Sequence, residues 1–215
     1  MMQDIIIIGA SGLGKEVAYH IKSINKINPS FNVVGFIDDN SSILNNELIY
    51  GLKVIGNLND LMNNKFDVKN ICIAIADNNI RFSIVEKLKH INFTFPNIID
   101  PSVNFDSSNS IGYGNIIGHG VLMTCNISLG NFNILNGSSG FGHDITISDF
   151  NLFGPRTSIS GCVKIGSLNT FNLNSSIIQN LIVGNGNTIN LHSCLFKSIK
   201  DDGVYFGVPA MKQRF

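Results

Sequence analysis

The residues in this sequence best suited to acid–base chemistry are His143 and Asp144, neighbours in the segment FGHDIT at 141–146. A histidine can take a proton from a reacting amine or hydroxyl near neutral pH. A carboxylate bonded to its second ring nitrogen would orient the imidazole and raise its basicity. Gly161 follows His143 by eighteen residues, and an unobstructed glycine N–H could stabilise a developing oxyanion. The alternative is that His143 is an exposed residue without a chemical role.

The segment around these residues repeats with a period of six. From Ile99 onward, every sixth residue is apolar at seventeen consecutive positions. These positions are Ile99, Phe105, Ile111, Ile117, Met123, Leu129, Leu135, Phe141, Ile147, Phe153, Ile159, Ile165, Phe171, Ile177, Val183, Ile189 and Leu195. Glycine follows the apolar residue in seven of the hexads. A fixed short period is the signature of a solenoid, so the repeat predicts a β-helix.

Each hexad is expected to supply a short strand and a corner. Its apolar side chain would point into the prism, and glycine or asparagine would take the positive-φ conformation that corners often need. Three hexads close one triangular coil, so residues eighteen apart stack at about the 4.8 Å spacing of neighbouring strands. His143 and Gly161 are both third in their hexads. They are therefore predicted to meet at one corner, as a general base beside an oxyanion donor.

The N-terminal segment IIIIGASGLGKEVA, at 5–18, indicates a strand, a glycine-rich turn and a helix. Its glycines, Gly9, Gly12 and Gly14, depart from the dinucleotide fingerprint, because Ser11 occupies the position of the second glycine. A phosphate could bind the exposed amides of this turn, where the helix dipole favours an anion. A tight turn without a ligand is the alternative.

Strands and helices then alternate, which predicts a parallel sheet of the Rossmann-like type. The predicted elements are a strand at 32–39, a short helix at 60–66, a strand at 68–77 and a helix at 79–91. Ligands of such sheets bind at the carboxyl ends of the strands, where Asp38, Asp39, Asp77 and Asn78 would gather. An acid after the second strand commonly holds a ribose hydroxyl, although a solvated carboxylate is the alternative. Only one mononucleotide-binding half is present, which argues against bound NAD.

The composition excludes several classes of partner. Fifteen basic and fifteen acidic residues cancel, so no broad field attracts nucleic acid or an anionic membrane. No apolar run is long enough for membrane insertion or a signal peptide. The four cysteines are widely spaced, so we expect no metal site and a reduced, cytoplasmic protein. Residues 99–200 hold only eight charged side chains, a change in composition that predicts two domains, 1–95 and 96–215.

The order of these features covers nearly the whole chain: a Rossmann-like half, a hexapeptide repeat, GHD at 142–144 and a terminal FGVPA at 206–210. It resembles the hexapeptide-repeat sugar O- and N-acetyltransferases, a family that includes the sialic acid O-acetyltransferases and the bacterial nucleotide-aminosugar N-acetyltransferases. The resemblance implies that the β-helix is left-handed and that acetyl-CoA is the donor. It also implies a homotrimer, with acetyl-CoA in the groove between neighbouring β-helices.

The resemblance further implies roles for the residues of the β-helix. His143 followed by Asp144 matches the catalytic base of the family, and Gly161 matches the glycine whose amide polarises the thioester carbonyl. Asn136, seven residues before the histidine, matches an asparagine that helps to place the acceptor in some members. Leu152 is a departure, because some members carry a second active-site histidine at that position.

In the first domain, ADNNIR at 76–81 resembles a Gly-Asp-Asn-x-x-Arg motif of the family, with Ala76 in place of the glycine. The resemblance implies that the first domain holds the nucleotide of an activated sugar rather than NAD. The expected substrate-binding residues are Gly9, Ser11, Gly12, Gly14, Asp38, Asp39, Asp77, Asn78, Arg81 and Asn136.

The resulting hypothesis is acetyl transfer from acetyl-CoA to the amino group of a nucleotide-linked 4-amino-4,6-dideoxy sugar, in bacterial surface polysaccharide or glycan synthesis. Transfer to a sugar hydroxyl, as in sialic acid O-acetylation, stays open, because an amine and a hydroxyl both need a base and an oxyanion donor. A non-catalytic β-helix that serves as an assembly scaffold is the remaining alternative.

Overall fold

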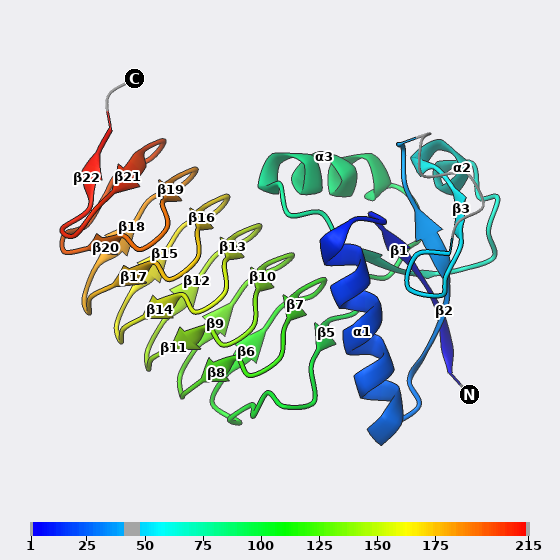
Figure 1. Cartoon of the computed structure of the whole chain (residues 1–215), viewed down its shortest axis with the longest axis horizontal. Coiled ribbons are helices and arrows are strands. Elements are labelled where there is room, and N and C mark those ends of the chain that lie inside the picture. The colour runs from blue at the N-terminus through cyan, green and yellow to red at the C-terminus, as the bar shows by residue number, and fades with distance from the viewer. Residues whose placement is uncertain (1, 41–47, 214–215) are drawn as a thin grey trace. The chain divides into compact units, whose positions relative to one another are not determined.

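The structure, a computed structural model, describes residues 2–40 and 48–213 (Figure 1). It divides into two compact units, Met1–Ile98 and Ile99–Phe215. The first unit alternates strands with helices, whereas the second consists of short strands that follow one another in a regular coil. Among the described residues, no helix is both long and apolar enough to cross a membrane.

The first unit contains a four-stranded parallel sheet with the order β3-β2-β1-β4. Its elements are β1 (Gln3–Ile8), α1 (Gly12–Ile27), β2 (Phe31–Ile37), β3 (Val54–Gly56), α2 (Leu58–Met62), β4 (Asn70–Ile73) and α3 (Asn78–Leu88). The isoleucines at 5–8 are all buried, as expected for a central strand of a parallel sheet. The predicted Rossmann-like half is confirmed, and the edge strand β3 is an addition that the sequence pattern did not predict.

Two loops of this unit lie at the carboxyl edge of the sheet. One leads from β1 to α1, whose N-cap is Ser11. The other leads from β4 to α3, whose N-cap Asp77 accepts a hydrogen bond from the N–H of Ile80 at 2.9 Å. Because β2 and β4 flank β1 on opposite sides, the strand order reverses here, which is where open parallel sheets bind ligands.

The second unit is a left-handed parallel β-helix, as the family resemblance implied. Successive strands fall in turn on three sheets, so a strand pairs with the strand eighteen residues later, as Phe141 pairs with Ile159. The last coil is two residues shorter, as Ile189 pairs with Tyr205. The coil ends in an antiparallel pair at the C-terminus. The strands are β5 (Ile98–Ile99), β6 (Ser110–Ile111), β7 (Ile116–Ile117), β8 (Leu122–Met123), β9 (Ser128–Leu129), β10 (Ile134–Leu135), β11 (Gly140–Phe141), β12 (Thr146–Ile147), β13 (Leu152–Phe153), β14 (Ser158–Ile159), β15 (Lys164–Ile165), β16 (Thr170–Phe171), β17 (Ser176–Ile177), β18 (Ile182–Val183), β19 (Thr188–Ile189), β20 (Cys194–Leu195), β21 (Val204–Phe206) and β22 (Met211–Lys212).

The repeated apolar residues fill the interior of the prism. From Ile117 to Leu195, every sixth side chain is at most 3% exposed. The rings of Phe153 and Phe171 stack on adjacent coils with their centroids 4.8 Å apart. The period of six in the sequence therefore places one apolar side chain of this set inside each side of the triangle, next to a second buried position at the fifth residue of most hexads.

A buried ladder of asparagines runs along one corner of the prism. Its members, eighteen residues apart, are Asn115, Asn133, Asn151, Asn169 and Asn187. The side-chain oxygen of each of the first four accepts a hydrogen bond from the backbone N–H of the next, at 2.8–2.9 Å. The last asparagine accepts in the same way from the N–H of Gly203. The ladder therefore satisfies buried backbone groups and fixes how the coils stack.

The corners bear out the expectation in part, because Gly114, Gly120 and Gly186 take a positive φ there, as do asparagines such as Asn126. The left-handed backbone conformation occurs at the fourth residue of the hexads. Many of these residues are not glycine, such as Phe150 and Cys162, both with φ of 59°. The glycines that follow the apolar residues serve another purpose. A Cβ on Gly142 would lie 2.8 Å from the nitrogen of Gly161, and one on Gly154 would lie 2.9 Å from a backbone oxygen. These glycines permit close approach of adjacent coils.

Candidate active site

His143 and Asp144 occupy the corner that follows β11 and lie in direct contact. The Nδ1 of His143 is 2.7 Å from Oδ2 of Asp144, and both side chains are about half exposed. The other carboxylate oxygen of Asp144 accepts a hydrogen bond from the side-chain amide of Asn126 at 3.0 Å. The hydrogen bond from His143, and then that from Asn126, lower the pKa of the Asp144 carboxyl below its ordinary value. An ionised carboxylate therefore fixes the imidazole with Nε2 on its free side.

Gly161 lies against the imidazole on the next coil, as the eighteen-residue spacing predicted. A Cβ built on Gly161 would lie 2.6 Å from both Cε1 and Nε2 of His143. The coils are joined there by a hydrogen bond of 2.9 Å from the N–H of Cys162 to the carbonyl of His143. Among the described residues, none accepts a hydrogen bond from the N–H of Gly161. The arrangement thus supplies a base and an available amide donor side by side.

Cys162 is a neighbour of this pair that the sequence analysis missed. The thiol of Cys162, a nitrogen of His143 and a carboxylate oxygen of Asp144 all lie within 4.8 Å of one another, and all three side chains are exposed. The signal was present in the sequence, because Asn126, Asp144 and Cys162 are spaced by eighteen residues. Residues at the fourth position of successive hexads stack just as those at the third position do, so the same spacing predicts this contact.

Asn136 does not join the cluster within one chain. It follows β10, and its corner precedes the corner that holds His143. Its N–H donates to the carbonyl of Phe153 at 2.9 Å, and its own carbonyl accepts from Ser139. The two side chains therefore lie on different edges of the prism, and a role for Asn136 in placing the acceptor stays a prediction.

The glycine-rich turn of the first unit has two glycines that packing requires and one that it does not. Gly9 has a φ of 101°, and a Cβ on Gly14 would lie only 2.0 Å from the carbonyl oxygen of Gly9. A Cβ on Gly12, in contrast, would have no atom of the described chain within 4 Å. Ser11 is exposed, and its side chain makes no capping hydrogen bond. The side of the turn formed by Ser11 and Gly12 is therefore free to approach a ligand.

Both acids after β2 have backbone partners in the structure. Asp38 accepts hydrogen bonds from the N–H of Ala10 at 2.8 Å and of Asn40 at 2.9 Å. Asp39 accepts one from the N–H of Leu58, the first residue of α2, at 2.8 Å. Asp38 therefore braces the glycine-rich turn, and Asp39 braces the start of α2. The two acids also line a pocket of about 150 Å³ at the carboxyl edge, whose other walls are largely isoleucine side chains.

Arg81, expected to bind substrate, is buried with no exposed surface. Its guanidinium donates to the carbonyls of Ile75 at 2.6 Å and Ala76 at 3.1 Å, and to the side chain of the buried Asn78 at 2.8 Å. Burial lowers the pKa of Arg81 to about 10, against the opposing effect of Asp77. In this conformation Arg81 holds the loop between β4 and α3 and does not face solvent.

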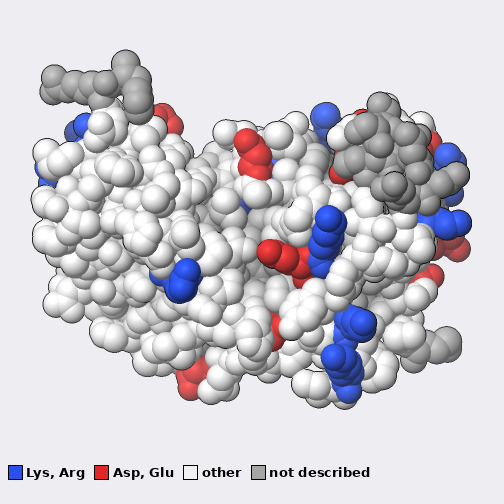
Figure 2. All heavy atoms as spheres, viewed as in Figure 1, with Lys and Arg blue, Asp and Glu red and all other residues white. Residues whose placement is uncertain are grey.

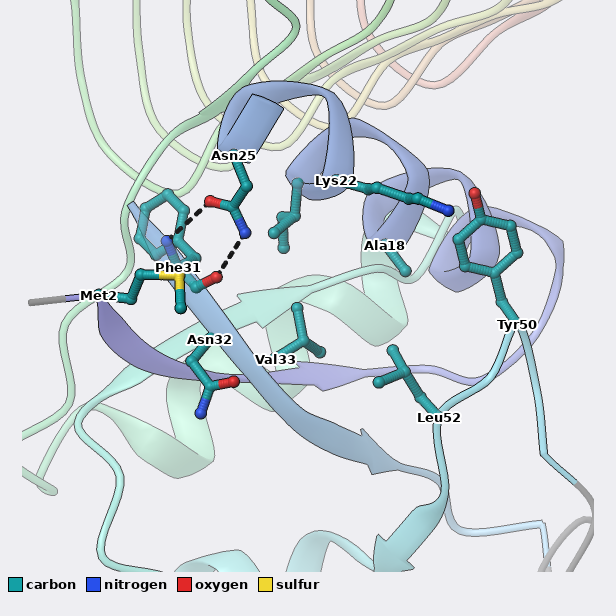
Figure 3. A pocket seen from close by; sticks show the side chains of 10 residues that line it. Met2, Ala18, Lys22, Asn25, Phe31, Asn32, Val33, Tyr50 and Leu52 are labelled. Atoms are coloured by element: carbon teal, nitrogen blue, oxygen red, sulfur yellow. Dashed lines mark hydrogen bonds between the residues drawn. The ribbon is translucent and has the colours of Figure 1, made fainter. Parts of the chain in front are cut away.

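A larger pocket of about 320 Å³ lies at the amino ends of β1 and β2, opposite the edge described above (Figure 3). Asn25 closes one end by accepting from the N–H of Phe31 at 3.1 Å and donating to its carbonyl at 2.7 Å. At the other end, the side chains of Lys22 and Tyr50 point toward one another (Figure 3). None of the residues expected to bind substrate lines this pocket.

Comparisons with known proteins cover both units. Residues 4–88 match the family model described as the PglD N-terminal domain. Among solved structures, the acetyltransferase domain of PglB from Neisseria gonorrhoeae FA1090, in complex with acetyl coenzyme A, is 25% identical with a TM-score of 0.89, and the match covers 99% of this chain and 100% of that chain. WeeI from Acinetobacter baumannii AYE is 25% identical with a TM-score of 0.79, over 99% and 100% of the two chains.

A third solved structure is perosamine N-acetyltransferase from Caulobacter crescentus, as a mutant in complex with CoA and GDP-perosamine. It is 21% identical with a TM-score of 0.89, over 100% of this chain and 99% of that chain. At this identity, the match supports the fold. A search of curated protein sequences gives no match.

Proposed function

From the premise that this chain is a member of the hexapeptide-repeat sugar acetyltransferases, we propose that it is an N-acetyltransferase acting on a nucleotide-linked 4-amino-4,6-dideoxy sugar. Acetyl-CoA is the proposed donor, as in the complex of the PglB domain. The perosamine of the Caulobacter complex is a sugar of the proposed class. This resemblance favours an amine over a hydroxyl as the acceptor group.

The observation that carries the proposal is the contact of His143 with Asp144 and Gly161. The carboxylate at Nδ1 selects the tautomer whose lone pair is on Nε2, which makes Nε2 the proposed general base. The amide of Gly161, next to this nitrogen, is the proposed donor to the thioester carbonyl oxygen. The three residues thus supply both groups that acyl transfer to an amine requires.

The proposed reaction is a direct attack. The sugar amine forms a C–N bond with the thioester carbonyl carbon while Nε2 of His143 takes a proton from the nitrogen. Negative charge on the carbonyl oxygen is stabilised by the N–H of Gly161, a contact of a kind worth about 3 kcal/mol in the transition state. The C–S bond then breaks, and the imidazolium returns the proton to the departing thiolate of CoA. Asp144 stabilises the imidazolium in between.

The first unit is proposed to hold the nucleotide. Phosphate oxygens would meet the amides of the open side of the glycine-rich turn, at Ser11 and Gly12. The nucleoside would enter the pocket beside Asp38 and Asp39, where the carboxylates retain lone pairs beyond those used by the backbone. Arg81 enters the proposal as a positioning residue for the loop at 75–78, because it is buried.

We further propose that the active form is a homotrimer. The face of the second unit seen in Figure 2 carries few charged residues. Large apolar side chains are exposed at several positions of the second unit, including Leu122, Ile182 and Phe196. Weakly charged surface of this kind marks interfaces, and closed cyclic symmetry is the usual way to cover it. Light scattering that shows a fully active monomer at assay concentration would refute this arrangement.

The bacterial cytoplasm is the proposed location. All four cysteines, Cys72, Cys125, Cys162 and Cys194, are free thiols in the structure. Thiols that persist unpaired are typical of reducing compartments.

The experiment that tests the function follows free-thiol release from acetyl-CoA with a panel of UDP-, dTDP- and GDP-linked 4-amino-4,6-dideoxy sugars, beside matched sugars with a hydroxyl at the same carbon. We expect release with one of the amines and none with its hydroxyl counterpart. Mass spectrometry should show one added acetyl group on the sugar. Release with hydroxyl acceptors alone would replace the proposal with O-acetylation, and no release with any acceptor would refute it.

A further inference from the structure

The cluster of His143, Asp144 and Cys162 offers three different metal-ligand groups at one exposed point. One ligand atom from each residue lies within 4.8 Å of the other two. Imidazole nitrogen, carboxylate oxygen and thiolate sulfur are the ligand types that zinc takes in proteins. A tetrahedral zinc site with bonds of about 2.0–2.3 Å places its ligand atoms roughly 3–4 Å apart. Small rotations of three exposed side chains would therefore close the site.

The backbone places the three residues at one corner, so closing such a site would not require movement of the coils. Asp144 and Cys162 are stacked in register, with almost equal φ values of 58° and 59°. The N–H of Cys162 is bonded to the carbonyl of His143, which fixes the two coils at this corner. Asn126 bonds to one oxygen of Asp144 and leaves the other oxygen directed at the imidazole. Gly161 carries no side chain that could cover the cluster.

Although the wide spacing of the cysteines in the sequence predicted no metal site, the cluster leads to the opposite inference. We propose that this corner binds a divalent transition metal such as zinc, through His143, Asp144 and the thiolate of Cys162, and that the bound metal inhibits the enzyme. Binding displaces the thiol proton of Cys162 to solvent and leaves the fourth coordination position to water. With the metal on Nδ1 of His143, the ring proton moves to Nε2, so the proposed base is lost, and Asp144 leaves its hydrogen bond to the ring for the metal. Inhibition rests on the function proposed above, whereas metal binding does not.

Absorption spectroscopy with cobalt(II) alone tests binding without any substrate. We expect the charge-transfer band of a cobalt–thiolate bond in the wild-type protein and its loss in Cys162→Ser. Cys125→Ser is the matched control, because Cys125 is an exposed cysteine one coil before His143 whose sulfur is not part of the cluster. The control should keep the band. A band that persists in Cys162→Ser, or that disappears only in Cys125→Ser, overturns the site.

The second measurement is zinc inhibition of acetyl transfer, with each variant compared with its own metal-free rate. Zinc should inhibit the wild-type enzyme and Cys125→Ser, and a chelator should restore activity. In Cys162→Ser the zinc concentration for half inhibition should rise about tenfold or more, since a ligand is lost. Equal sensitivity of wild type and Cys162→Ser overturns the inhibitory role. If no acceptor is acetylated while the cobalt band is present, the proposed function fails and the metal site stands.

Discussion

Replacing Gly161 with alanine should lower kcat while leaving the free energy of unfolding nearly unchanged. The new Cβ would lie 2.6 Å from Cε1 and Nε2 of His143, whereas ordinary contacts begin at 3.4 Å. The imidazole must therefore move by about 1 Å, and a displacement of that size can cost about 100-fold in rate. We expect kcat to fall by about 100-fold, which corresponds to about 2.7 kcal/mol. Alanine keeps the backbone N–H at this position, so the fall in kcat would be due to the displaced imidazole and not to a lost oxyanion donor.

Stability should change little in Gly161→Ala. The backbone of Gly161 is not in the left-handed region, and the side chain of His143 is 57% exposed, so it can move aside at the expense of one exposed hydrogen bond to Asp144. We therefore expect the free energy of unfolding to change by less than about 0.5 kcal/mol, as for other surface substitutions. Gly140→Ala is the matched control, because a Cβ there would have no atom of the described residues within 4 Å. Its kcat and Tm should both equal those of the wild type.

The assay is thiol release at saturating acetyl-CoA and acceptor, with thermal unfolding of the same preparations. If Gly161→Ala has the same kcat as the wild type, the imidazole of His143 is not the general base. A loss of kcat that is matched by a large drop in Tm, or shared by Gly140→Ala, would mean that the coil and not the catalytic geometry has been disturbed.

Four further outcomes are expected. His143→Asn should lower kcat by at least about 100-fold, and Asp144→Asn should lower it less, because the second variant keeps the base and loses only the charge that orients it; equal kcat in the wild type and His143→Asn would exclude the general base. Asp38→Ala should raise KM for the nucleotide sugar and also reduce the free energy of unfolding by about 1–2 kcal/mol, since Ala10 loses its acceptor; an unchanged KM contradicts nucleotide binding at this edge. Arg81→Met should destabilise the fold by about 2–4 kcal/mol, because the carbonyls of Ile75 and Ala76 and the buried side chain of Asn78 lose their donor. A higher KM with unchanged Tm would instead indicate direct contact with substrate. Cys72 should resist alkylation in the native protein at pH 8, because burial raises its thiol pKa to about 12; rapid labelling of Cys72, mapped by mass spectrometry, would contradict its burial.

The β-helix and the meeting of His143 with Gly161 could be predicted because a strict period turns sequence distance into spatial distance. Any two residues eighteen apart stack, whatever their type, so one comparison along the chain was enough. The same rule places Cys162 beside Asp144, because both are fourth in their hexads. This contact was therefore predictable, although only residues at the third position were used to predict the site. The asparagines from Asn115 to Asn187 likewise recur every eighteen residues at the fifth hexad position, so their stacking could also be predicted from the sequence.

The first unit was less predictable at the level of side chains. Its alternating pattern predicts that Asp38 and Asp39 end a strand, but whether a carboxylate there meets a ligand or a backbone N–H depends on the turn beside it. Arg81 lies in a motif that suggests contact with substrate. Its guanidinium is instead buried, because the carbonyls of Ile75 and Ala76, in the loop between β4 and α3, accept its hydrogen bonds. A charge pattern in sequence carries no information about such loop carbonyls. The strand β3 is short and lies at the sheet edge, so its propensity signal is weak.

The asparagine ladder has a consequence for how the length of this protein can change during evolution. Each asparagine of the ladder gives its side-chain oxygen to the backbone of the next coil, in a column where both partners are buried. An insertion or deletion that moves one asparagine of the ladder off the column would leave buried polar groups without partners, at a cost of about 1–3 kcal/mol for each. The shorter coil after Asn187 keeps its bond, to Gly203, because the ladder ends there. A change of a whole coil leaves every remaining bond intact. Variation in length should therefore occur in steps of eighteen residues, and longer or shorter relatives should keep the corner at His143 unchanged while they differ in the number of coils that follow it.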